Sequence, residues 1–313
     1  MNIEYINPLS RAWGRMKKAL FQPFDLKKWF IVGFSVFLAD LMDGSYGNGP
    51  SGIHDGKHAD LDNFFDFPRI AWEWLMAHPV WFTLIIFGVV FLIVLTVLLT
   101  WLSSRGKFMF LDNVVHDRAQ IVKPWNEFKE HGNSLFLWRL VFGLICLCIV
   151  IVFAVTGFSL AARIYHGSLK VPESVLLIIV LTLVALFAFV IIAFISLFLN
   201  NFVIPIMYRS NIGTNQAWQQ FLSLFSRYPF HFILYGLFLF VLYVAVVICV
   251  IIACLLTCCI GFLFLIIPYI NAVVLLPISY AFRAFSVEFL GQFGPGFVLF
   301  PEEKIEQGGE IPD

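Results

Sequence analysis

Charged residues are scarce in this sequence, and their scarcity excludes most classes of soluble protein. Asp, Glu, Lys and Arg make up only 13% of the 313 residues, whereas 60% are hydrophobic and the mean hydropathy is +0.89. A soluble protein of this length could not bury that much apolar surface in one core, so lipid has to solvate most of it. The formal net charge is zero, so no nucleic-acid partner is indicated.

Recognisable catalytic motifs and cysteine-based metal motifs are also lacking. The six cysteines all lie in apolar runs without a CxxC pair or a Cys/His cluster, so we expect free thiols that pack as small hydrophobic side chains. No glycine-rich phosphate loop, HExxH or GxSxG motif occurs, and no cofactor is expected. The N-terminus has no secretory signal pattern, so we expect the first hydrophobic helix to be retained.

Long apolar runs are what the sequence does contain, and they predict an all-α integral membrane protein. The first run is short, because about 14 residues rise only about 21 Å against about 30 Å of hydrocarbon. We expect one transmembrane domain over 1–295, with an extracytoplasmic loop at 43–78 and a polar tail at 296–313. Six spanning helices are expected, at about 29–42, 81–102, 135–161, 175–202, 230–257 and 260–282.

Three of these runs follow an amphipathic segment that begins with a tryptophan, Trp13, Trp125 or Trp218. In the last segment apolar residues recur at i, i+3, i+4 and i+7, as on one face of a surface helix. A bundle of six helices built as three repeats of surface helix plus transmembrane hairpin would explain this pattern. The other interpretation is that tryptophan simply favours the water–lipid boundary. The expected repeats cover approximately 8–102, 120–202 and 214–287.

The distribution of basic residues predicts the orientation in the membrane. Of the 20 Lys and Arg residues, 15 fall before the first, third and fifth expected spans or after the sixth. Lys and Arg favour the cytoplasmic side, so both termini and all three surface helices are expected there, in a plasma (inner) membrane. Basic and aromatic residues on these helices can then contact anionic lipid headgroups. The candidate lipid-binding residues are Trp13, Arg15, Lys17, Lys18, Trp125 and Trp218.

Polar residues and prolines in the even-numbered spans could line a pathway through the bundle. The candidates are Asn200, Asn201, Asn271 and Tyr280, with helix breaks at nearby prolines. Hydrogen bonds between helices at the kinks would explain the same residues without any pathway.

Charged and histidine residues at three other places could also have a function. His54 and His58, with nearby aspartates, form the one dense group of metal-capable side chains, but the neighbouring glycines favour a solvated loop, and no metal is expected. Arg139 lies about one helical turn inside the third span, where we expect its long side chain to reach the headgroups. Arg283 and Glu288 lie near a helix end and are expected to be structural.

The segment from Pro277 to Pro295, PISYAFRAFSVEFLGQFGP, echoes an earlier PIMY at Pro205–Tyr208, which is followed by Ala217-Trp218. These motifs resemble a family of uncharacterised prokaryotic polytopic proteins. That family is similar to the membrane domain attached to some glycerophosphodiester phosphodiesterases. The resemblance implies an integral membrane protein and no catalytic residues, because this chain has no soluble phosphodiesterase domain.

Three functions remain open at this point. The first is a non-enzymatic membrane protein that binds lipids or protein partners through its bundle and its cytoplasmic surface helices. The second is a transporter or channel that uses the pseudo-threefold axis or the kinked even-numbered helices. The third is a lipid-modifying enzyme that uses His54 and His58. The oligomeric state is not indicated by the sequence.

Overall fold

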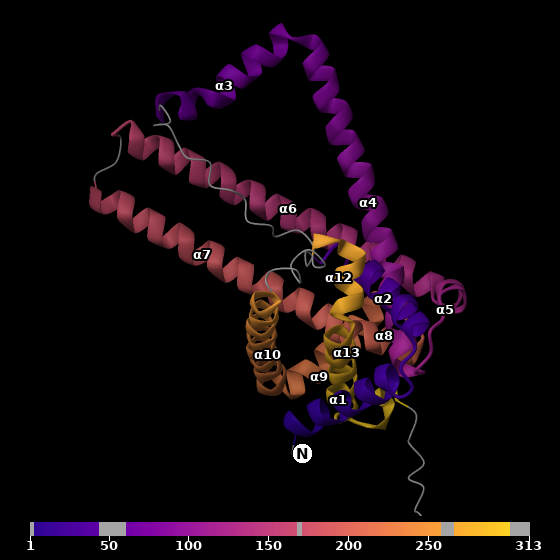
Figure 1. Cartoon of the computed structure of the whole chain (residues 1–313). Helices are drawn as coiled ribbons and strands as arrows, with labels where there is room; N and C mark the ends of the chain where they lie inside the picture. Colours follow the sequence, from indigo (N-terminus) through magenta and orange to yellow (C-terminus); the bar gives the residue numbers. More distant parts are fainter. Residues whose placement is uncertain (1–2, 44–60, 168–170, 258–265, 301–313) are drawn as a thin grey trace, which may run out of the picture. The chain divides into compact units, whose positions relative to one another are not determined.

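The computed structural model of the chain describes residues 3–43, 61–167, 171–257 and 266–300 (Figure 1). Every regular element within these ranges is helical, which confirms the all-α class. The chain divides into two compact units. The first unit comprises Met1–Ala39, Arg105–Gly132 and Leu197–Asp313, and the second unit comprises Asp40–Ser104 and Asn133–Ser196.

Four helical runs are long and apolar enough to cross a membrane, so the chain is a membrane-embedded protein. Hardly any side chain in their most apolar stretches is buried within the protein, as expected where lipid is the solvent. They are α4 (Pro79–Val115), α6 (Lys129–Tyr165), α10 (Pro229–Leu256) and the run Pro172–Ser210, which takes in most of α7 (Val171–Phe198), η1 (Leu199–Val203) and α8 (Ile204–Ser210). These four correspond to the expected second to fifth spans.

The first and sixth expected spans do not form simple crossings in the part of the chain that the structure describes. The first becomes α2 (Leu26–Asp40), which has only 15 residues and buries much of its surface in protein. The sixth is represented by α12 (Pro268–Val274) and α13 (Leu276–Gly291), which bend by 64° at their junction and count as a fifth crossing if taken together. Four or five spans are therefore supported, and residues 258–265, with the expected Cys258-Cys259 turn, lie outside the described residues.

Helix α4 is much longer than a membrane is thick, and its last part is buried in protein. Its 37 residues rise about 55 Å, against about 30 Å of hydrocarbon. The sequence predicted that the helix would end near Leu102, followed by a charged connection. Instead it continues to Val115, and Lys107, Phe108 and Asp112 are almost completely buried. This segment, Arg105–Val115, forms the centre of the first unit's core.

Aromatic side chains fill the rest of that core. The Phe202 ring stacks on Phe221, with 5.5 Å between ring centres, and meets Phe232 edge-on at 4.9 Å. The ring centres of Tyr235 and Phe289 lie 4.6 Å apart. Such offset and edge-on pairs add about 0.5–1.5 kcal/mol each beyond area burial. The cluster joins η1, α9 (Thr214–Arg227), α10 and α13, so segments far apart in the sequence share one apolar centre.

The last backbone carbonyls of α1 (Ile6–Phe21) accept hydrogen bonds from side chains of α2. Lys28 Nζ donates to the carbonyl of Ala19 at 2.6 Å, and Trp29 Nε1 donates to the carbonyl of Leu20 at 2.8 Å. The last carbonyls of a helix have no partner within the helix and carry partial negative charge, so a lysine there is favourable. These bonds fix the corner between α1 and α2. The other side of α1 packs along α13, where Arg15 forms an ion pair with Glu288 at 2.7 Å.

The backbones of α2 and α4 meet at Gly106. A Cβ atom at this position would lie 2.7 Å from both the backbone nitrogen of Ala39 and the carbonyl carbon of Leu38. These are backbone atoms, so no side-chain rotation could relieve the clash. Gly106 therefore allows the close approach that glycine gives membrane helices.

We predict that Gly106→Ala destabilises the protein by about 1–3 kcal/mol, because the added methyl forces the α2 and α4 backbones apart. The measurement is thermal unfolding of purified protein in detergent. Gly14→Ala is the matched control: no atom lies within 4 Å of its added methyl, and it should be neutral or stabilising by up to about 1 kcal/mol. Equal melting temperatures for the two variants would contradict the close approach.

Candidate functional site

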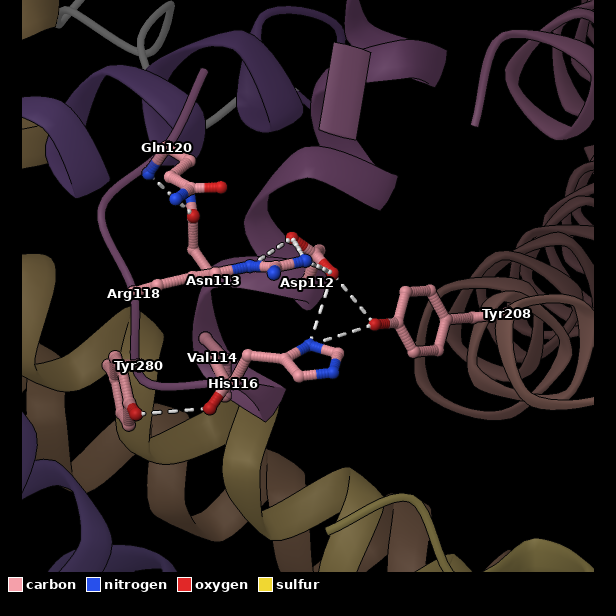
Figure 2. A network of polar contacts seen from close by, with 8 residues as sticks. All are labelled: Asp112, Asn113, Val114, His116, Arg118, Gln120, Tyr208 and Tyr280. Atoms are coloured by element: carbon pink, nitrogen blue, oxygen red, sulfur yellow. Dashed lines mark hydrogen bonds and ion pairs between the residues drawn. The ribbon is translucent and has the colours of Figure 1, made fainter. Parts of the chain in front are cut away.

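A polar network surrounds the carboxylate of Asp112 at the end of α4 (Figure 2). Arg118 donates from Nη2 to both carboxylate oxygens at 2.7 Å and from Nε to Oδ2 at 3.0 Å. The Tyr208 hydroxyl donates to Oδ1 at 2.8 Å, and Nδ1 of His116 lies 3.1 Å from the same oxygen. Three side chains from two parts of the chain thus converge on one carboxylate.

Burial makes this network energetically important. The Asp112 side chain is 1% exposed, while Arg118 is 23% and His116 is 46% exposed. A buried carboxylate is costly unless charge and hydrogen bonds compensate it, and the two-pronged guanidinium contact of Arg118 does both. His116, held at Nδ1, points its other ring nitrogen away from Asp112 (Figure 2). Through these contacts the loop after α4 and helix α8 are both held against the last turns of α4.

The two echoed tyrosines both bind the end of α4. Tyr208, from PIMY, reaches Asp112, and Tyr280, from PISY, donates to the carbonyl of Val114 at 3.2 Å (Figure 2). Each motif has its proline in the first turn of a helix, α8 or α13, directly after a break. Proline is tolerated there because the first-turn amide needs no intrahelical partner. In both motifs the tyrosine lies three residues after the proline and contacts the last turn of α4.

The loop after α4 connects this network to the corner between α1 and α2. Gln120 donates its backbone N–H to the Asn113 side chain at 3.0 Å, and Arg118 is fixed by Asp112. Between them, Asp117 adopts a left-handed backbone, with φ of 48°, and pairs with Lys28 at 2.9 Å. Since Lys28 also binds the end of α1, the Asp112 network helps to position the basic N-terminal helices.

A second polar junction lies at the π-helix η1. Lys107 donates to the Asn200 side chain at 2.6 Å, and Arg283 donates to the Asn200 backbone carbonyl at 2.6 Å. A π-helix interrupts the regular backbone pairing, so its carbonyls need outside donors. Arg283, which the sequence suggested to be structural, has this role, and Glu288 pairs with Arg15.

The expected pathway residues lie in separate local environments. Asn200 is held as described, Asn201 donates to the carbonyl of Leu197 at 3.0 Å, and Tyr280 is bound to α4 and 2% exposed. Asn271, on α12, is buried, and its Oδ1 has no hydrogen-bond partner among the described residues. Three of the four therefore serve contacts between or within helices, and their role in a pathway stays a prediction.

The expected lipid-binding residues differ in their exposure. Trp13 is 48% exposed and Lys17 and Lys18 are exposed, whereas Arg15 pairs with Glu288 and lies 4.1 Å from the Phe300 ring centre. Trp125, in α5 (Val122–Glu127), is half-buried beside the Arg105 guanidinium, and Trp218 is half-buried against Phe221. Of these three tryptophans, Trp13 is therefore the exposed one.

The apolar faces of the amphipathic helices pack on protein. In α1 the buried residues include Ala12, Met16 and Leu20, and in α9 they include Ala217 and Phe221. The spacing in α9 predicted a face of Trp218, Phe221, Leu222 and Phe225 on the membrane surface; Phe221 is buried in protein, whereas Leu222 is exposed. The opposite, charged face of α1 is the one that remains exposed.

Arg139, in the second unit, is held by protein groups. It pairs with Asp43 at 3.0 Å and donates to Ser103 Oγ at 3.0 Å, and its side chain is 12% exposed. We expected it to reach the headgroups. Because an unpaired cation at this position would be costly, the carboxylate and hydroxyl provide an internal alternative to the headgroups.

His54 and His58 lie outside the described residues, so the structure does not bear on the lipid-modifying hypothesis. Among the residues that it does describe, no group of three or more His, Cys, Asp or Glu side chains could hold a metal ion.

The model of a family of unknown function, DUF7544, matches residues 4–278 of the chain. The chain belongs to this family. No curated protein and no solved structure matches it. For this DUF7544 member the comparisons confirm the expected uncharacterised family, and they give no evidence on the similarity to the phosphodiesterase-associated membrane domain.

Sequence reasoning about this DUF7544 chain missed Asp112, Arg118 and His116, because it treated 103–133 as a connection. One signal was available in the sequence: the charged connection contains the apolar run FMFL between Lys107 and Asp112, and such a run favours burial. Tyr208 was noticed through its motif, but its partner could not be read from the motif.

We predict that Asp112→Asn lowers the free energy of unfolding of the DUF7544 protein by about 3 kcal/mol, because Arg118 loses its buried counter-charge. Thermal unfolding in detergent at neutral pH is the measurement. Asp117→Asn is the control: its carboxylate is 53% exposed, asparagine tolerates the left-handed backbone, and the loss should stay below about 1 kcal/mol. A larger loss from Asp117→Asn than from Asp112→Asn would refute the central role of Asp112.

Proposed function

We propose that this chain is a non-enzymatic multi-pass protein of the plasma (inner) membrane that binds anionic lipids through its N-terminal helices. The single observation that carries the proposal is a basic–aromatic surface on the exposed side of α1 and the start of α2. It consists of Arg11, Trp13, Lys17, Lys18, Phe21, Phe24 and Lys27, all exposed.

The composition of the basic–aromatic surface suits a membrane interface. Lys17 Nζ lies 5.9 Å from the Trp13 ring centre, so a cation and an amphipathic ring act at the same place. Phe21 and Phe24 each contact the Trp29 ring at 5.5 Å, which holds two exposed aromatic side chains at the corner between α1 and α2. Aromatic rings favour the headgroup level, and each basic residue near an anionic surface adds about 1 kcal/mol of attraction.

Asp25 is the acidic residue within this surface, and it has a structural task. Its carboxylate accepts the backbone N–H of Lys27 at 2.8 Å, as a helix-capping residue does at the start of α2. The surface therefore keeps an excess of positive charge. Binding of a protein partner at the same surface is compatible with this chemistry, since acidic peptides share it with acidic lipids.

The orientation that accompanies this proposal has both termini in the cytoplasm, and three repeats of surface helix plus hairpin remain part of it. Two observations support the repeat. α1 and α9 are both amphipathic helices that precede an apolar helix, and Tyr208 and Tyr280 make corresponding contacts with α4.

A transporter or channel is the second candidate. The observation in its favour is Asn271, whose buried Oδ1 has no hydrogen-bond partner among the residues that the structure describes. Asn271 lies near the 64° break between α12 and α13. Broken helices commonly form substrate sites in transporters. Because Asn200, Asn201 and Tyr280 make contacts that stabilise the fold, lipid binding is the better-supported function.

For the lipid proposal, we predict that Lys17→Gln combined with Lys27→Gln weakens binding of phosphatidylglycerol by about 2 kcal/mol, about thirtyfold, because two attractive charges are lost. Native mass spectrometry of detergent-solubilised protein, titrated with phosphatidylglycerol and with phosphatidylcholine, measures the preference for the anionic lipid. Lys123→Gln with Lys129→Gln makes the same charge change at exposed positions elsewhere and should keep the preference. If both pairs reduce it equally, the effect is net charge and the proposed surface is wrong.

For the orientation, we predict that cysteines placed at Lys123 and Gln219 react with a membrane-impermeant maleimide only from the cytoplasmic side. Both positions are exposed, and the six native cysteines would first be replaced by alanine. A cysteine at exposed His166 should react only from the opposite side. Labelling of positions 123 and 219 from different sides would refute the parallel arrangement of the repeats.

A further inference from the structure

Within the second unit, side chains near the C-terminal end of α6 and in the first half of α7 line a groove. Its volume is about 320 Å³, within the range of about 300–1,000 Å³ that is usual for small-molecule sites. Gly157 lies next to the groove on α6, and a Cβ atom there would lie 3.9 Å from Leu181 Cδ2 of α7. The lining residues are Thr156, Ser159, Leu160 and Arg163 of α6 and Leu177, Val180, Leu181 and Val184 of α7.

Most of this groove presents apolar surface. The α7 side is entirely aliphatic. On the α6 side, Thr156 Oγ1 donates to the carbonyl of Val152 at 2.7 Å, and Ser159 Oγ donates to that of Thr156 at 2.9 Å. Both hydroxyl groups already donate within α6, so they do not need a hydrogen-bond acceptor on a ligand. The occupant that fits this surface is a hydrocarbon chain.

The one strongly polar group in the groove is the guanidinium of Arg163. It is exposed, lies in the last turn of α6, and makes no hydrogen bond or ion pair with any residue that the structure describes. Glu173, in the first turn of α7, does not pair with it. The apolar run of α6 ends at Arg163, which places the guanidinium at the hydrocarbon boundary. At this depth a membrane offers phosphate groups, which guanidinium binds through paired hydrogen bonds.

We propose that the groove between α6 and α7 binds one phospholipid molecule, with its phosphate on Arg163 and one acyl chain along Leu177, Leu181 and Val184. The contact is to the phosphate diester, so phosphatidylcholine and phosphatidylglycerol both fit. This site differs from the basic–aromatic surface, which selects the charge of the headgroup. If the Arg163 side chain only extended into water, an apolar groove beside it would have no purpose.

The test is native mass spectrometry of the full chain in detergent, titrated with phosphatidylcholine. Arg163→Gln should weaken the tightest binding event about tenfold, as expected when a charge-assisted hydrogen bond is lost. Leu181→Trp should weaken it as well by filling the groove, whereas Leu84→Trp, on a lipid-exposed part of α4, should not. Diacylglycerol, which lacks the phosphate, should bind no better to the wild type than to Arg163→Gln.

Each other outcome overturns the site. Unchanged binding in Arg163→Gln, or in a Leu181→Trp variant with wild-type melting temperature, shows that lipid binds elsewhere. Competition by millimolar inorganic phosphate alone shows an anion site without a role for the groove. The Lys17 and Lys27 variant should leave phosphatidylcholine binding unchanged, so failure of the groove and failure of the N-terminal surface give different results.

Discussion

A carboxylate without water around it must be compensated by groups brought from elsewhere in the chain, and Asp112 imposes that requirement on the first unit. Arg118 closes the loop after α4, and Tyr208 comes from the other end of the π-helical break. Their contacts tie two segments, the loop after α4 and helix α8, to the last turns of α4. Lys28, paired with Asp117 in the same loop, extends the constraint to α1 and α2. One buried charge thus organises the part of the molecule that carries the N-terminal basic helices.

The length of α4 makes this arrangement possible. A helix of about 55 Å can cross about 30 Å of hydrocarbon and still extend by about four turns beyond it. Those extra turns are apolar enough to form a core, with Phe108 and Leu111 fully buried, and polar enough to bind other segments through Lys107 and Asp112. The first, apolar part of α4 is exposed to lipid, whereas its last part, Arg105–Val115, is surrounded by protein. The same division separates the exposed aliphatic residues of the spans from the buried aromatic cluster around Phe202 and Phe232.

The amphipathic helices illustrate how far sequence patterns reach. The face of α9 that carries Phe221 was predicted from its spacing, and Phe221 is indeed fully buried. The partner was different: aromatic rings of η1 and α10 cover it rather than lipid. An apolar period of 3.6 residues indicates that one face of a helix avoids water. It does not indicate whether protein or hydrocarbon covers that face. For Arg139 the cost of burial was clear from the sequence, whereas the distant Asp43 that compensates it was not.

The sequence by itself determined the all-α class, the membrane location and the four long spans, because hydrocarbon demands long apolar helices and these are written locally. It also marked the PIMY and PISY segments and the basic N-terminal residues. Only the tertiary structure decided that α2 is partly enclosed by protein, that α4 runs on to Val115, and that both motif tyrosines meet there. These outcomes depend on contacts between residues far apart in the sequence, such as Asp112 with Tyr208, which are 96 positions apart. No local pattern encodes such pairings, because each partner alone is compatible with many neighbours.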